Sequence, residues 1–163
     1  MPDPGGAAIV FAAVVRVGVP GGELCALALD LPRYARVEPR LRSAEWIDGG
    51  PAAVGADAEV VGDIPFSFPL FEALIGQPRG VARLEELDLG SSLAYSLETP
   101  RARGYLRAEF AEDRGETVVD VRGWICPRSR AGRRSVGPLA PMLNPVVSGM
   151  VGRAVARAAA AVA

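Results

Sequence analysis

The sequence LAPMLNPVVSGMVGRAVARAAAAV occupies residues 139–162, and the fold that we predict is built around this stretch. Its apolar residues recur every three or four positions, which is typical of a helix with one buried face. They are Leu139, Met142, Leu143, Val146, Val147, Met150, Val151, Ala154, Val155 and Ala158. Asn144 followed by Pro145 predicts the helix start, because asparagine caps helices and proline is tolerated at the first helical position. Such a helix needs a large apolar surface to cover.

Alternating apolar and polar residues predict that a sheet supplies this surface. Strands are expected at residues 7–17, 42–48, 54–64, 80–88, 91–98, 103–111 and 117–126, and short helices at 23–30 and 33–37. Most gaps between the strands are short enough for hairpins, which favours antiparallel pairing. Residues 127–137 are expected to form a basic loop. The predicted fold class is α+β, with a seven-stranded curved antiparallel sheet, two short helices after the first strand and a long C-terminal helix in a single domain, residues 1–163.

The composition excludes several classes of function. The net charge of −1 gives no electrostatic reason to expect nucleic-acid binding. The chain has no histidine, which removes Ser-His-Asp and Cys-His nucleophiles and the usual zinc and iron sites. We therefore expect no metal and no cofactor. The two cysteines, Cys25 and Cys126, are expected to be buried thiols.

Stable membrane insertion is not expected either. Prolines interrupt the uncharged stretch at residues 136–152, and Arg153 and Arg157 follow within the same predicted helix. The N-terminus lacks the positive charge that begins a signal peptide. We expect a cytoplasmic protein.

Three local patterns match one known family. Residues 19–39, with Asp30-Leu31-Pro32 near their centre, match its opening strand-to-helix motif; residues 43–55 match its second and third strands; and residues 115–119, GETVV, match the entry to its last strand. In these patterns and in the order of its elements, the chain resembles the START-like (SRPBCC) superfamily, and especially its bacterial polyketide cyclase/dehydrase and lipid-transport branch. The resemblance implies a helix-grip fold, in which the terminal helix closes a hydrophobic cavity that binds lipids, polyketides or other apolar molecules.

Strand parity and this resemblance together suggest which residues meet a ligand. Trp46 and Tyr95 are candidate amphipathic walls, each with one polar atom. The apolar connection at residues 64–75 could be a lid, a dimer contact or a segment packed on the sheet, so a homodimer is possible. The expected ligand-binding residues are Trp46, Phe66, Phe68, Phe71, Tyr95, Phe110, Trp124, Met142, Val146 and Met150.

The last hairpin allows two registers. A two-residue turn immediately before Gly115 sets Arg107 opposite Asp120 on the solvent face, and we favour this register. If Gly115 instead takes the left-handed position of a three-residue turn, the register moves by one residue. Arg122 and Trp124 would then face the cavity, because a one-residue shift moves every side chain to the other face.

Three functions remain open. The first is binding of a hydrophobic small molecule, which predicts an almost wholly apolar cavity. The second is a polyketide cyclase or aromatase-like enzyme, in which orienting the substrate supplies much of the catalysis. It predicts that at least two of Tyr95, Glu86 and Arg122 converge in a deep cavity. The third is a protein-interaction module, which predicts a filled core.

Overall fold

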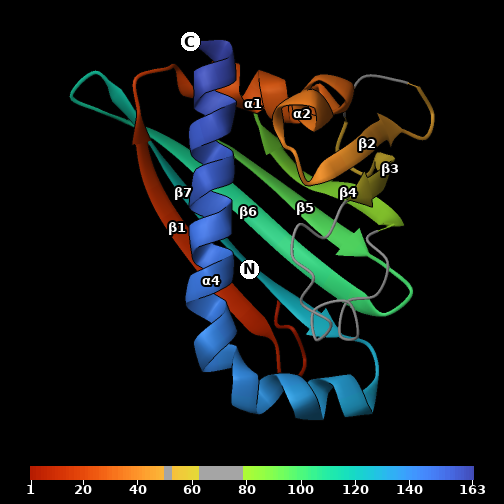
Figure 1. Cartoon of the computed structure of the whole chain (residues 1–163). Helices are drawn as coiled ribbons and strands as arrows, with labels where there is room; N and C mark the ends of the chain where they lie inside the picture. Colours follow the sequence, from red (N-terminus) through yellow and green to blue (C-terminus); the bar gives the residue numbers. More distant parts are fainter. Residues whose placement is uncertain (50–52, 63–78) are drawn as a thin grey trace.

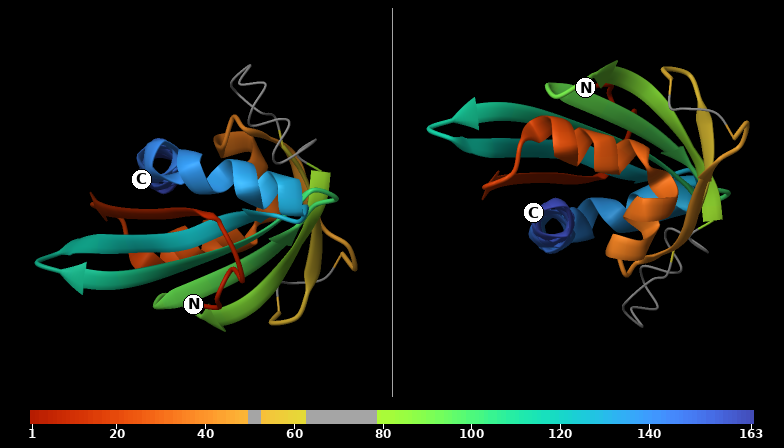
Figure 2. Two further views of the ribbon diagram at one scale, coloured as in Figure 1. Left: turned by 90° about the horizontal axis from the view of Figure 1, so that it is seen from below. Right: turned by 90° about the horizontal axis from the view of Figure 1, so that it is seen from above.

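A seven-stranded antiparallel sheet is the frame of the computed structural model, which describes residues 1–49, 53–62 and 79–163. The spatial order is β1-β7-β6-β5-β4-β3-β2. The strands are β1 (Ile9–Val17), β2 (Leu41–Trp46), β3 (Asp57–Gly62), β4 (Arg79–Asp88), β5 (Ser92–Glu98), β6 (Ala102–Asp113) and β7 (Glu116–Pro127). The sheet curls around the helices, which lie on its concave side (Figure 1 and Figure 2). The predicted α+β class with seven antiparallel strands is confirmed.

Two short helices, α1 (Gly21–Leu29) and α2 (Leu31–Val37), cover one end of the concave face. The Asp30 carboxylate caps α2 by accepting a hydrogen bond from the Arg33 amide at 3.2 Å. The last carbonyls of α1 also find partners on the sheet, because the Tyr95 hydroxyl donates to Ala28 at 3.0 Å and the Trp46 indole donates to Leu29 at 3.1 Å. These bonds satisfy carbonyls that have no partner within the helix.

The long helix α4 (Arg130–Val162) begins earlier than the sequence predicts. Its N-cap is Ser129, whose hydroxyl accepts a hydrogen bond from the Gly132 amide at 2.9 Å. The predicted start at Asn144 and the predicted basic loop at residues 127–137 are therefore wrong, since most of that loop is helical. Three prolines lie inside α4, at positions 138, 141 and 145. Each removes a backbone donor, and the helix bends in this region, so that its first turns cross the end of the sheet (Figure 1).

After the bend, α4 runs along β1, the edge strand of the sheet. Two amides of β1 donate to polar side chains of α4: Val10 to the Asn144 carbonyl at 3.0 Å, and Ala12 to the Ser148 hydroxyl at 3.1 Å. An edge strand otherwise presents unpaired amides. Asn144 thus bonds to a strand instead of capping the helix.

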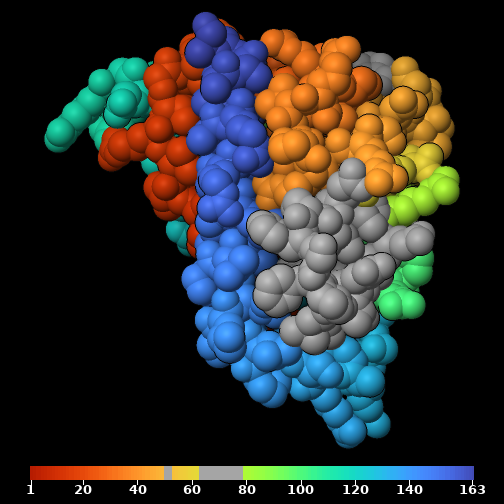
Figure 3. All heavy atoms as spheres, in the orientation of Figure 1, coloured from red at the N-terminus to blue at the C-terminus, as the bar shows by residue number. Residues whose placement is uncertain are grey.

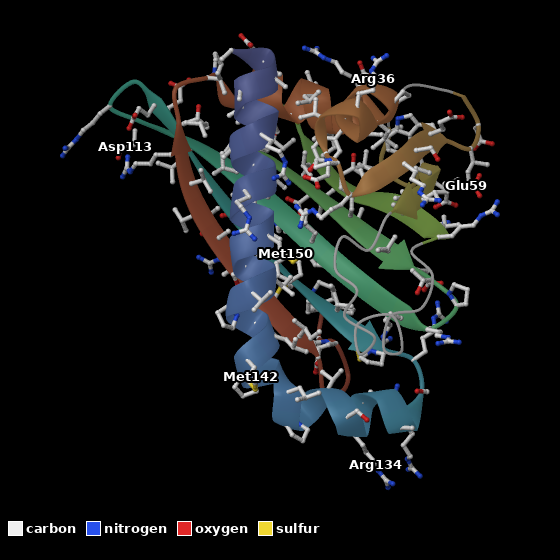
Figure 4. All side chains as sticks on the ribbon, viewed as in Figure 1. Arg36, Glu59, Asp113, Arg134, Met142 and Met150 are labelled. Carbon is white, nitrogen blue, oxygen red and sulfur yellow. The ribbon has the colours of Figure 1, made fainter. Side chains whose placement is uncertain are left out.

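This contact rotates α4 relative to the predicted apolar stripe. Val147 and Ala158 are buried as predicted, but Met142 and Val146 are 71% and 51% exposed. Met142 lies on the outer side of α4 (Figure 4). The prediction fails for these two residues because the polar Asn144 and Ser148 take part of the face that is turned to the sheet.

The β6–β7 hairpin has neither of the two predicted registers. Its two-residue turn is Arg114-Gly115, one position later than expected, with φ angles of 56° and 86°. This pair of positive φ values is typical of the type I′ turn, whose twist matches the flanking strands. Arg107 consequently lies opposite Arg122 instead of Asp120. Because the pairing moves by two positions, Arg122 keeps the solvent face that we favoured, although the register itself was wrong.

Within residues 1–49, 53–62 and 79–163, no helix combines the length and the hydropathy needed to cross a bilayer.

Candidate functional site: a cavity between sheet and helices

A cavity of about 440 Å³ lies between the concave face of the sheet and the three helices. Its wall is mainly apolar and includes Leu24 of α1, Leu93 of β5, Phe110 of β6, Val121 of β7 and Val155 of α4. Cavities that hold small-molecule ligands have volumes of roughly 300–1,000 Å³ and similar linings. On the surface, α4 and the α1–α2 pair lie side by side over this part of the sheet (Figure 3). The described residues leave this space open, in contrast to the filled core that the interaction-module hypothesis predicts.

Small side chains explain why this space stays open. Four of the strand positions on the wall are Ala44, Ala82, Gly104 and Ala108, and α4 contributes Ala154. Protein interiors are normally close-packed, so leucine or isoleucine at these positions would fill much of the volume. The hollow thus depends on the size of particular side chains as well as on the curvature of the sheet.

The predicted ligand-binding residues divide into several groups. Tyr95 and Phe110 line the cavity. Trp46 stands behind Tyr95, with the two ring centroids 6.5 Å apart, and does not line it. Met142 and Val146 face solvent, and Met150 is half-buried without being part of the wall.

Trp124 borders the cavity, but its register places its ring on the convex face. There the ring stacks on Tyr105 with centroids 6.4 Å apart, and its indole donates to the Pro2 carbonyl at 2.9 Å. The N-terminal segment therefore buries Trp124 from outside, and the ring is not oriented toward a ligand in the cavity.

Phe66, Phe68 and Phe71 lie outside the described residues. The three alternatives for the connection that carries them, a lid, a dimer contact or a segment packed on the sheet, stay predictions.

The candidate catalytic residues do not converge. Tyr95 lines the cavity, but its hydroxyl already donates to the Ala28 carbonyl, and burial raises its pKa well above the ordinary value. It is therefore a neutral, engaged donor at physiological pH. Arg122 is 67% exposed on the convex face and pairs with Asp120 at 2.7 Å.

Glu86 lies outside the cavity, in contrast to the prediction, because β4 contains an irregularity. The pairing of β4 with β5 shifts between Leu84 and Glu86, so that Leu84 points inward and Glu86 points outward. On the convex face Glu86 forms an ion pair with Arg107 at 3.0 Å and accepts a hydrogen bond from Ser92 at 2.8 Å. The hydrogen bond from Arg107 and then that from Ser92 lower the pKa of this carboxylate. Simple alternation along the strand had placed it on the inner face.

A group of polar residues that the sequence analysis did not identify lies at the α2 end of the cavity. We call Tyr34, Glu38, Arg40 and Arg157 the Glu38 cluster. Glu38 is only 6% exposed. Its two carboxylate oxygens accept from different arginines, Arg40 Nε at 2.6 Å and Arg157 Nη2 at 2.5 Å. Arg40 also donates to the Met150 carbonyl of α4 at 3.1 Å, so the cluster joins α2, the α2–β2 link and α4.

Electrostatics in the Glu38 cluster favour the charged carboxylate. Burial alone would raise the pKa of Glu38, but hydrogen bonds from Arg40 and Arg157 outweigh it and the net pKa is lowered. Burial raises the pKa of Tyr34, and the charge of Glu38 adds to this shift. The cluster thus contains two guanidinium groups, one carboxylate and a neutral phenol, and its net charge is positive.

The described part of the chain holds no group of three acidic, cysteine or histidine side chains arranged around a possible metal position.

The architecture is the helix-grip fold of START-like (SRPBCC) proteins. Among solved structures, Ara h 8.0201 has 14% identity and a TM-score of 0.67, with 96% of this chain and 98% of that chain covered. The protein TTHA0849 from Thermus thermophilus has 13% identity and a TM-score of 0.71, with 94% and 96% covered. A START superfamily protein from Mycobacterium smegmatis has 14% identity and a TM-score of 0.55, with 93% and 92% covered.

Sequence comparison adds no closer relative. No protein-family model matches the chain, and no curated protein sequence is significantly similar to it. The likeness therefore shows the fold alone.

Proposed function

We propose that this protein binds a hydrophobic small molecule, such as a lipid or polyketide-like compound, in the cavity between the sheet and α4. The observation that carries the proposal is the apolar wall around about 440 Å³ of space. An apolar molecule that enters such a space leaves water, which contributes roughly 25 cal/mol per Å² of apolar surface buried. START-like architecture is consistent with this role, since the structurally similar superfamily binds hydrophobic ligands.

Binding is favoured over catalysis by where the polar groups lie. The cyclase hypothesis requires at least two of its three candidate residues in the cavity. Glu86 and Arg122 are on the convex face, while the Tyr95 hydroxyl is bonded to α1. We therefore propose a carrier or binding protein.

A pair of substitutions on α4 tests the proposal. Ala154 belongs to the cavity wall, whereas Ala156, two residues further on, is exposed. Ala154→Leu should place a larger side chain in the open space and weaken binding of the apolar dye N-phenyl-1-naphthylamine about tenfold, which is the effect of losing roughly 1.4 kcal/mol of binding free energy. Ala156→Leu adds the same atoms outside and should leave binding unchanged.

Titration of the dye by fluorescence measures both variants, and thermal unfolding shows that each is folded. Equal affinity in Ala154→Leu and Ala156→Leu would place the dye elsewhere on the protein. Failure of the unmodified protein to bind any apolar probe would overturn the proposal.

A further inference from the structure

The Glu38 cluster has more hydrogen-bond donors than acceptors. Both oxygens of Glu38 are occupied by Arg40 and Arg157. The Nε atom of Arg157 is buried and has no hydrogen-bond partner. The Tyr34 hydroxyl, at the cavity wall, has no hydrogen-bond acceptor among the residues that the structure describes. The buried Arg157 nitrogen is a costly donor without an acceptor, whereas the Tyr34 hydroxyl is not fully buried and can donate to an acceptor in the cavity.

The charge of the cluster points in the same direction. Two arginines face a single carboxylate, which leaves one positive charge uncompensated within the Glu38 cluster. Tyr34, Glu38 and Arg40 contribute to the cavity wall, whereas Arg157 lies behind it. The charges of Arg40 and Arg157 both act on the Tyr34 hydroxyl. Guanidinium groups pair especially well with planar carboxylates. The rest of the wall is mostly alanine, leucine, valine and phenylalanine, which fits an apolar body.

We propose that the cavity selects an apolar molecule that ends in a carboxylate, with the carboxylate held at Tyr34 and Arg40, close to the charge of Arg157, and the apolar body in the alanine-lined hollow. This inference rests on the proposed function and names the chemical class of its ligand. Tyr34 donates its hydroxyl to the carboxylate, and Arg40 and Arg157 supply the opposite charge. Glu38 is a positioning residue, since it holds the two guanidinium groups at the end of the cavity.

Three compounds with the same twelve-carbon tail test the selectivity: dodecanoate, dodecan-1-ol and dodecylammonium. Each displaces bound N-phenyl-1-naphthylamine at about pH 7.5, where the first is anionic, the second neutral and the third cationic. Dodecanoate should bind about tenfold more tightly than dodecan-1-ol, because hydrogen bonds to charged groups are worth more than neutral ones. Dodecylammonium should bind most weakly, since it brings a second cation beside the arginines.

Two variants connect this selectivity to the Glu38 cluster. Tyr34→Phe removes one hydroxyl and should weaken dodecanoate about tenfold. The dye affinity of this variant is titrated first, so that the displacement by dodecanoate is corrected for any change in dye binding. Arg157→Gln should reduce the preference for dodecanoate over dodecan-1-ol to a similar extent. Arg153→Gln is the matched control, because Arg153 lies on the exposed side of α4 one turn earlier, and it should change nothing. If Arg157→Gln does not fold, Tyr34→Phe alone decides the question.

The outcomes separate the two proposals. Equal displacement by all three compounds, or unchanged dodecanoate affinity in Tyr34→Phe, would overturn the carboxylate assignment and leave apolar binding intact. If the dye itself does not bind, both proposals fail. A loss of dodecanoate affinity in Arg153→Gln as large as in Arg157→Gln would show that general surface charge attracts the anion, and would also overturn the assignment.

Discussion

Glu38→Gln should destabilise the protein far more than Glu59→Gln, although both carboxylates form an ion pair with an arginine at the same distance. Glu38 meets Arg40 at 2.6 Å, and Glu59 meets Arg79 at 2.6 Å. The two sites differ in burial, because the Glu38 side chain is 7% exposed and the Glu59 side chain is 50% exposed. Figure 4 shows Glu59 at the β2–β3 end of the sheet. Glu38 also pairs with a second arginine, Arg157, so the comparison sets a buried carboxylate held by two arginines against an exposed carboxylate held by one.

The expected magnitudes follow from this difference. Removing one partner of a buried pair costs about 3–5 kcal/mol, because the remaining charge is left uncompensated. Arg157 is 35% exposed and regains some hydration, so we expect the lower end, about 3 kcal/mol. For a chain of this length that corresponds to a fall in Tm of roughly 6–12 °C. An exposed pair contributes about 0–1 kcal/mol, so Glu59→Gln should shift Tm by a few degrees at most.

The pH dependence gives a second measurement of the same contact. The arginines lower the pKa of Glu38 in the folded protein, so the folded state binds its proton less readily than the unfolded state does. The stabilisation is complete above the unfolded pKa of about 4.3 and is lost as pH falls through the lowered folded pKa. The stability gap between the unmodified protein and Glu38→Gln should therefore be constant near neutrality and close in acid.

Thermal and urea unfolding followed by circular dichroism would measure these differences. Equal destabilisation by Glu38→Gln and Glu59→Gln would refute the argument from burial. A gap that persists unchanged at about pH 3, below the unfolded pKa, would refute the assignment of the effect to the ionised carboxylate.

Two further substitutions test how the frame is held together. Replacing both Asn144 and Ser148 with alanine should leave two amides of β1 without acceptors and cost about 1 kcal/mol per hydrogen bond. Hydrogen exchange at these two amides should become faster, and unchanged exchange would contradict the contact. Gly123→Ala should cost about 1–3 kcal/mol or more in urea unfolding, because its added carbon would lie 2.2 Å from the Tyr105 carbonyl oxygen and 2.4 Å from the Phe11 ring. Gly22, which has open space around it, is the control for alanine substitution, and an equal loss at both glycines would rule out the steric explanation.

The strands could be predicted because their signal is local. In β3, Ala58 is buried, while Asp57 and Glu59 lie on the other face and pair with Arg83 and Arg79. Alternation in a few neighbouring residues is enough to show this arrangement. The short connections then favoured antiparallel pairing of neighbouring strands. The pairing of β1 with β7, at the other end of the chain, did not follow from any local signal.

The start of α4 could not be predicted in the same way. Asn144-Pro145 has the local pattern of a helix start, but the Asn144 side chain accepts from Val10, which is 134 residues away in sequence. The actual cap, Ser129, lies before a basic segment that reads as a loop. A local capping rule cannot distinguish these cases, because the tertiary contact decides what the polar side chain does.

The candidate site was only partly predictable for a related reason. Tyr95 and Phe110 were identified by parity, which holds along uninterrupted strands. Parity failed at Glu86, because the shift in pairing next to Leu84 reverses the faces. The Glu38 cluster could not be predicted, because Arg157 is 119 residues from Glu38 in sequence. The residues around Arg157 show only the periodicity of a helix.

The alanines in the wall have a consequence for how this protein could diverge in evolution. Ala82, Ala108 and Ala154 lie on strands or a helix, so replacing any of them by valine or leucine would change the shape of the cavity without changing the path of the backbone. Each such replacement requires only one or two nucleotide changes. Descendants of one ancestral sequence could thus come to prefer shorter, broader or bent guests while retaining an identical scaffold, and their divergence would be concentrated at small residues that stability alone would leave free to enlarge.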